Sequence, residues 1–183
     1  MRSALITGLS GLRLTADEAG FLSATRPCGI ILFTRNCESH EQIRTLVAAA
    51  KEAIGESDLL VLIDQEGGRV QRLRPPLGRA LPPAAAYAAL FADDPERACR
   101  AAQAAARLVA EDLSALGINT DCAPVLDVPV AGSHDVIGDR AYGATPAQVA
   151  RIGRAVAEGF IAQGMTRLRT TSRRSPATRR GRK

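Results

Sequence analysis

The sequence has none of the long hydrophobic runs that mark a membrane protein. Apolar runs such as 29–33 and 59–63 are short, and nothing approaches the ~18 residues from which a membrane-spanning helix is predicted. The N-terminal segment carries Arg2 but reaches Arg13 and Asp17 before the apolar region or cleavage site of a signal peptide appears. We therefore expect no membrane span and a cytoplasmic location.

Cysteine and histidine are scarce and poorly placed for metal binding. The four cysteines are Cys28, Cys37, Cys99 and Cys122. No two of them have the two-residue gap of a zinc ribbon or a redox motif, and the two histidines, His40 and His134, lie far apart. We expect free thiols in a reducing compartment, with no metal and no cofactor.

The net charge of +5 is concentrated at one end of the chain. Residues 166–183 hold eight of the 24 basic side chains and no acidic one, which leaves 16 basic against 19 acidic side chains in residues 1–165. The longer part is therefore mildly acidic, and a nucleic-acid partner is not expected for it. We divide the chain into one domain, residues 1–165, and a basic tail, residues 166–183.

Apolar runs and helical patterns alternate four times along residues 1–165. The strand candidates are 5–9, 29–33, 59–63 and 119–128, the last bent or shortened by Pro124. Helices are expected from the capping box Thr15-x-x-Glu18, from Ser39 to Gly55, over 95–116, and from Thr145-Pro146 to about Gln163. Continuous apolar strands are typical of parallel strands buried on both faces, which predicts an α/β fold.

Two α/β architectures fit this alternation: an open doubly wound sheet and a (β/α)₈ barrel. The turn after the first strand reads GLSGLRLTADE rather than the GxGxxG of a dinucleotide-binding sheet. Polar residues instead follow several strands, at Arg35-Asn36, Asp64–Arg69 and Asp127, as in barrel enzymes. Because a barrel takes about 250 residues, four units predict half of a TIM-type barrel.

The stretch LLVLIDQEGGRVQRL places a polar loop directly after a buried strand. Asp64 emerges at the strand end, Gly67-Gly68 allows a tight turn, and Arg69 and Arg72 follow. A second glycine-bracketed loop, IGDRAYG at 137–143, carries another acid and arginine. Two interpretations stand: a solvated strand-to-helix turn with an internal Asp–Arg pair, or a site for a polyhydroxy or acidic ligand, since guanidinium groups donate several hydrogen bonds in a fixed fork.

Four motifs in order resemble the bacterial β-N-acetylhexosaminidases of glycoside hydrolase family 3. They are GIILFTRN, DQEGGRVQR, APVLDV and IGDRAYG. The resemblance implies that this α/β chain is the N-terminal half of a TIM-type barrel. It also implies an enzyme that releases terminal β-linked N-acetylglucosamine from muropeptides in the cytoplasm. It also implies that Asp64, Arg72 and Arg140 bind the sugar. A family-3 β-glucosidase is disfavoured, because DQEGGRV matches the hexosaminidase branch better.

The same resemblance implies catalytic groups that do not match residues of this chain. The family continues from Gly-Met into a fifth strand and a Lys-His-x-x-Gly-His-Gly motif, then supplies a histidine acid/base and an aspartate nucleophile. Here Gly164-Met165 is followed by the basic tail. A retaining glycosidase needs both groups, so we assign no catalytic residue and expect no turnover by the isolated chain. The alternative is a non-catalytic module that binds N-acetylglucosamine or a muropeptide.

The tail admits three interpretations, of which we favour an out-of-frame reading. Its arginine, serine, threonine and proline are typical of a shifted frame in a high-GC gene, and the change falls inside a family motif. A basic arm that binds nucleic acid and a disordered extension are the other two. Half a barrel leaves its outer strands unpaired, so we also expect poor solubility, loose packing or self-association through the open side.

Overall fold

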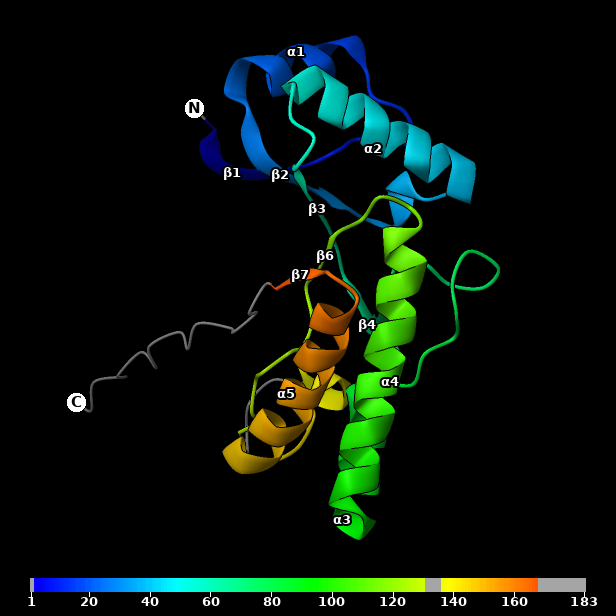
Figure 1. Cartoon of the computed structure of the whole chain (residues 1–183), viewed down its shortest axis with the longest axis vertical. Coiled ribbons are helices and arrows are strands. Elements are labelled where there is room, and N and C mark those ends of the chain that lie inside the picture. The colour runs from blue at the N-terminus through cyan, green and yellow to red at the C-terminus, as the bar shows by residue number, and fades with distance from the viewer. Residues whose placement is uncertain (1, 131–135, 168–183) are drawn as a thin grey trace, which may run out of the picture.

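The computed structural model describes residues 2–130 and 136–167 (Figure 1). The strands are β1 Ser3–Gly8, β2 Pro27–Leu32, β3 Leu60–Ile63, β4 Gln65–Gly67, β5 Val70–Gln71, β6 Thr120–Asp121 and β7 Thr166–Arg167. The helices are α1 Ala16–Thr25, α2 His40–Ile54, α3 Ala84–Asp93, α4 Pro95–Ser114 and α5 Pro146–Ala162, with short 3₁₀ turns η1 Thr34–Asn36 and η2 Gly138–Arg140.

Five strands form one parallel sheet in the order β1-β2-β3-β6-β7. Ile63 of β3 is in register with Asp121 of β6, which is in turn in register with Arg167 of β7. The predicted alternation of parallel strands and helices is confirmed, and the fold is the N-terminal half of a TIM-type barrel. Within residues 2–130 and 136–167 the barrel is not closed, because β1 and β7 lie at opposite ends of the strand order.

The expectation of four strands is wrong at β7, which pairs with β6 and includes the first two residues of the predicted tail. A two-residue strand without an apolar run carries no periodicity that could predict it. The expected strand 119–128 shrinks to β6, because Pro124 cannot donate a ladder hydrogen bond. The rest of the predicted tail, 168–183, and His134 lie outside the described residues.

Helices cover the sheet in two groups that are separate in Figure 1. Helices α1 and α2 pack together beside β1 and β2, whereas α4 packs along α5 in the other half of the molecule. Between them lies a core of aliphatic side chains, including Ile30, Leu32, Val61 and Ile63, all fully buried. Burial on both faces explains why β2 and β3 read as unbroken apolar runs.

Polar caps set the starts of the helices as predicted. Thr15 and Glu18 form the capping box of α1, and Ser39 accepts a hydrogen bond from the Gln42 amide at the start of α2. Asp94 and Thr145 cap α4 and α5 in the same way. Such caps satisfy amides that lack partners in the first turn of a helix.

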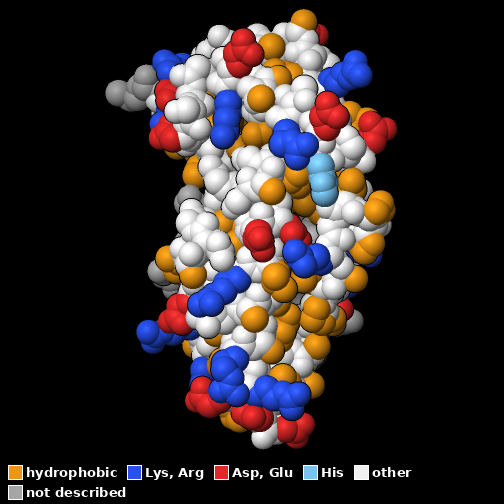
Figure 2. Space-filling view, turned by 45° about the vertical axis from the view of Figure 1, so that its right-hand side comes forward, with side chains coloured by type: hydrophobic (Ala, Val, Ile, Leu, Met, Phe, Trp, Pro, Cys, Tyr) orange, Lys and Arg blue, Asp and Glu red, His pale blue; other side chains and the backbone are white. Residues whose placement is uncertain are grey.

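The proline-rich connection before α4 contains a helix that was not predicted. Helix α3 begins after Pro83, which has no side chain that could cap it. Within the described residues, the structure has no helix long and apolar enough to span a membrane. Figure 2 shows acidic and basic side chains interspersed over one face, with apolar side chains between them.

Candidate functional site

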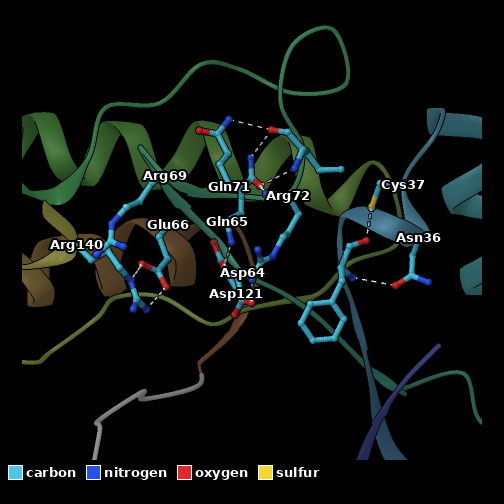
Figure 3. A network of polar contacts seen from close by, with 12 residues as sticks. Asn36, Cys37, Asp64, Gln65, Glu66, Arg69, Gln71, Arg72, Asp121 and Arg140 are labelled. Atoms are coloured by element: carbon cyan, nitrogen blue, oxygen red, sulfur yellow. Dashed lines mark hydrogen bonds and ion pairs between the residues drawn. The ribbon is translucent and has the colours of Figure 1, made fainter. Parts of the chain in front are cut away.

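Three neighbouring parallel strands end at the same edge of the sheet and carry side chains of the candidate site. Phe33 follows β2, Asp64 follows β3, and Asp121 is the last residue of β6. The parallel register of these strands brings their carboxyl ends together, and this is the edge at which α/β folds bind ligands. Figure 3 shows Asp64 and Asp121 close together below the β4–β5 hairpin.

Asp64 forms an ion pair with Arg72, as one of the two interpretations of the sequence expected. The distance from Arg72 Nη2 to Asp64 Oδ2 is 2.5 Å, and the side chains are 27% and 20% exposed, respectively. The Arg72 guanidinium also lies over the Phe33 ring, with Cζ 5.6 Å from the ring centroid. The pair is partly shielded from water yet still reachable by a ligand.

Gln65 closes the hairpin that carries Arg72, although the sequence did not single it out. Its Oε1 accepts hydrogen bonds from the Arg72 and Leu73 amides, both at 3.0 Å. Its Nε2 donates to the Leu73 carbonyl at 2.8 Å. Gln65 is buried, so these bonds replace water and fix Arg72 opposite Asp64.

The tight turn predicted at Gly67-Gly68 is confirmed. Both glycines have positive φ, +97° and +56°, a region that side chains with a Cβ avoid. A Cβ at Gly67 would collide with the carbonyl oxygen of Pro82, and one at Gly68 would collide with Pro83. The turn therefore needs glycine for both conformation and space.

Arg140, predicted from the second loop, reaches β4 of the hairpin through an ion pair with Glu66. Its Nε and Nη2 donate to the two carboxylate oxygens of Glu66 at 2.8 and 2.7 Å. This hydrogen bond, with the nearby charges of Asp127 and Asp64, raises the pKa of Arg140. The structure thus brings Asp64, Arg72 and Arg140 to one region, and adds Glu66 to them (Figure 3).

A second ion pair joins the same two loops, with the arginine now in the hairpin and the carboxylate in the second loop. Arg69 of the hairpin turn donates to Asp139 of η2 at 2.7 Å and to the carbonyls of Val136 and Ile137 at 2.7 and 3.1 Å. Each loop therefore gives one arginine to a carboxylate of the other. Such partners lie about 70 positions apart in the chain, so local sequence offered no signal for them.

Asp121 is a buried carboxyl that sequence reasoning did not select. It is 2% exposed; its Oδ1 accepts the Gln65 amide at 2.9 Å, whereas Oδ2 has no hydrogen-bond partner among the described residues. Burial raises the pKa of Asp121 to about 7, with smaller contributions from the charges of Asp64 and Glu66. The buried carboxyl therefore keeps its proton to a higher pH than an exposed aspartate does.

Two polar residues expected at the rim, Arg35 and Asn36, form hydrogen bonds that stabilise the loop after β1. Asn36 is fully buried and donates to the carbonyls of Leu9 and Gly11 at 3.1 and 2.8 Å, while its Oδ1 accepts the Phe33 amide. Arg35 donates to the Leu9 carbonyl at 2.9 Å. These bonds hold the loop after β1 against the end of β2.

The ion pairs of the site restrict the class of ligand that can bind there. Arg69, Arg72 and Arg140 are each bound to a carboxylate, and Asp121 adds a further acid beside them. An acidic ligand would have to compete with these carboxylates, whereas hydroxyl groups can both donate to Asp64 and accept from the arginines. Of the two ligand classes expected from the sequence, the geometry favours a neutral polyhydroxy compound.

A parallel half-barrel with paired carboxylates and arginines at its strand ends has the architecture of a barrel-type glycosidase. The model of the glycosyl hydrolase family 3 N-terminal domain matches residues 5–170. The chain belongs to this family.

Similar proteins include beta-hexosaminidases from several bacteria. The chain is 43% identical over 157 residues to the beta-hexosaminidase of Methylococcus capsulatus, covering 86% of this chain and 45% of that protein. It is 40% identical over 161 residues to the one of Xanthomonas campestris pv. campestris, covering 88% and 47%. The chain thus spans about half the length of the relatives it matches.

Solved structures agree with this assignment. NagZ from Neisseria gonorrhoeae, solved in complex with N-trifluoroacetyl-D-glucosamine, superposes with a TM-score of 0.83 at 36% identity, covering 90% of this chain and 48% of that one. A family 3 beta-N-acetylglucosaminidase from Paenibacillus sp. gives a TM-score of 0.76 at 36% identity, covering 87% and 30%. The predicted resemblance to the hexosaminidases of this family is confirmed.

Proposed function

We propose that this chain is the sugar-binding half of a β-N-acetylhexosaminidase that releases terminal β-linked N-acetylglucosamine from muropeptides. The observation that carries the proposal is the pairing of Asp64 with Arg72 beside Arg140 with Glu66 at the strand ends. Asp64 would accept hydrogen bonds from hydroxyl groups of the sugar, and the two arginines would donate hydrogen bonds to its hydroxyl oxygens. Such contacts orient the sugar for attack at its anomeric carbon.

Binding and bond cleavage are separate tasks in this enzyme class. A retaining glycosidase needs a nucleophile on one side of the anomeric carbon and an acid/base on the other. The family motifs that would supply them match no part of residues 1–165. The proposal therefore gives the isolated chain affinity for the sugar without turnover.

A titration of the isotope-labelled chain with N-acetylglucosamine, followed by NMR, tests this proposal. We expect saturable shifts of signals from Asp64, Arg72 and Arg140, and an affinity about 10- to 100-fold weaker in Asp64→Asn, because hydrogen bonds to charged groups contribute ~1.5–3 kcal/mol. Asp58→Asn is the matched control, since Asp58 is 70% exposed and pairs with Arg2. Absence of saturable binding, or hydrolysis of a chromogenic N-acetylglucosaminide by the chain alone, would contradict the proposal.

We place this activity in the cytoplasm. The support comes from the cysteines: all four are free thiols, and each is partly buried. Unpaired cysteines are typical of reducing compartments. Fractionation of cells that express the tagged chain tests this location, and recovery in a secreted or periplasmic fraction would contradict it.

Self-association through the open side of the half-barrel is the second part of the proposal. In the described residues, β1 is an edge strand that pairs with β2 on one side and with no strand on the other. Its Leu5 and Ile6 are 37% and 40% exposed. Exposed apolar edge strands pair readily with another chain. We expect a concentration-dependent dimer by analytical ultracentrifugation, weakened by Ile6→Lys. A monodisperse, cooperatively melting monomer at all concentrations would refute it.

A further inference from the structure

The Arg140 guanidinium is held along one edge by Glu66. Nε and Nη2 donate in parallel to the two carboxylate oxygens at 2.8 and 2.7 Å. On the other side, Nη1 approaches the Val136 carbonyl at 3.5 Å. A two-point contact of this kind fixes the plane and the rotation of the guanidinium, which a single hydrogen bond would not do.

The pair is also protected from water. The Glu66 side chain is 9% exposed and that of Arg140 is 23% exposed. A guanidinium has five N–H donors, of which two are given to Glu66 and one points toward Val136. Two donors remain, and their direction is set by the two-point contact with Glu66.

We propose that Glu66 is a positioning residue for sugar recognition: its carboxylate orients the Arg140 guanidinium so that the remaining donors meet the sugar bound at Asp64. This inference rests on the proposed function, because the ligand is the one proposed above. Both Glu66 oxygens accept hydrogen bonds from Arg140, so in this proposal the carboxylate acts on the sugar through that guanidinium. The energetic effect on sugar binding passes through Arg140.

The ion pair between Arg69 and Asp139 offers a matched control. Arg69 and Asp139 join the same two loops at 2.7 Å, but their side chains are 48% and 41% exposed. Asp139→Asn weakens this connection and leaves the contact between Glu66 and Arg140 intact. Glu66→Gln keeps the shape of the side chain and one acceptor oxygen, but loses the charge and the two-point contact.

The first measurement follows the Arg140 Nε–H signal by NMR in the ¹⁵N-labelled chain of 183 residues. Arg140→Lys identifies the signal by its loss. We expect slow exchange with water in the wild type, about tenfold faster exchange and a changed shift in Glu66→Gln, and no change in Asp139→Asn. The dispersion of the backbone amide signals shows whether each variant is folded. An unmoved Arg140 signal in folded Glu66→Gln overturns the inference.

The second measurement is the affinity of the same variants for N-acetylglucosamine. We expect about tenfold weaker binding in Glu66→Gln, an unchanged affinity in Asp139→Asn, and no further loss when Glu66→Gln is added to Arg140→Lys. Equal affinity of the wild type and Glu66→Gln would overturn the inference and leave the proposed function standing. If the wild type binds no sugar, the proposed function fails, and the Arg140 signal alone decides whether Glu66 fixes that guanidinium.

Discussion

Replacing Asp121 by asparagine should make the stability of the protein less dependent on pH. Burial raises the pKa of Asp121 from its ordinary value of 3.8 to about 7 in the folded chain. The folded state therefore holds more protons than the unfolded state between about pH 4 and 7. The contribution of this group is fully favourable below pH 4 and is lost as pH rises through 7.

The size of the effect follows from the shift in pKa. About three pKa units correspond to about 4 kcal/mol at ~1.4 kcal/mol per unit, of which about 3 kcal/mol falls between pH 5 and pH 8. Asparagine retains an oxygen that can accept the Gln65 amide, which Asp121 Oδ1 accepts at 2.9 Å, but it carries no charge. The wild type should therefore lose about 3 kcal/mol more than Asp121→Asn over this range.

Urea unfolding of both proteins at several pH values, at one fixed protein concentration, measures this difference. The concentration is fixed because association contributes to apparent stability. The other titrating groups are present in both proteins and cancel to first order in the comparison. Parallel pH profiles, with the difference between the two proteins constant within ~0.5 kcal/mol, would refute the assignment of a raised pKa to Asp121.

Three further substitutions test the local geometry by the same urea unfolding assay. Gly67→Ala places a Cβ against the Pro82 carbonyl at a φ of +97° and should cost at least ~2 kcal/mol; an unchanged midpoint would contradict the turn. Asn36→Ala removes three hydrogen bonds in a buried position and should lower the free energy of unfolding by ~2–3 kcal/mol. A decrease below ~0.5 kcal/mol would contradict the role of Asn36 in holding the loop after β1. Thr15→Ala removes the cap of α1 and should cost ~1 kcal/mol. Asp139→Asn is the surface control, with an expected change below ~1 kcal/mol.

Much of the fold could be predicted because its signals are local. Helix caps at Thr15 and Ser39 and the glycines that close the turn after β3 each act within a few residues, so their spacing in the sequence suffices. The apolar runs of β2 and β3 reflect burial on both faces of a parallel sheet. Helix α3, which starts after a proline, and the two-residue strand β7 lack these signals.

Some members of the candidate site could be predicted from the sequence, but the contacts between its two loops could not. Asp64, Arg72 and Arg140 were found from motifs, and the pairing of Asp64 with Arg72 needs only the turn between them. The pair of Arg140 with Glu66 depends on how two distant loops meet, which no local pattern encodes. The raised pKa of Asp121 could not be predicted from the sequence, because it results from burial and from neighbouring carboxylates that only the fold brings together.

A chimera tests the central claim most directly. Residues 1–165 would replace the corresponding half of the Methylococcus capsulatus beta-hexosaminidase, to which the matched part of the chain is 43% identical. The account predicts a folded chimera that hydrolyses a chromogenic β-N-acetylglucosaminide, with a rate about 100-fold lower when Asp64→Asn is introduced. A folded chimera without hydrolysis, or one whose rate does not depend on Asp64, would contradict the claim that this half of the barrel binds the sugar.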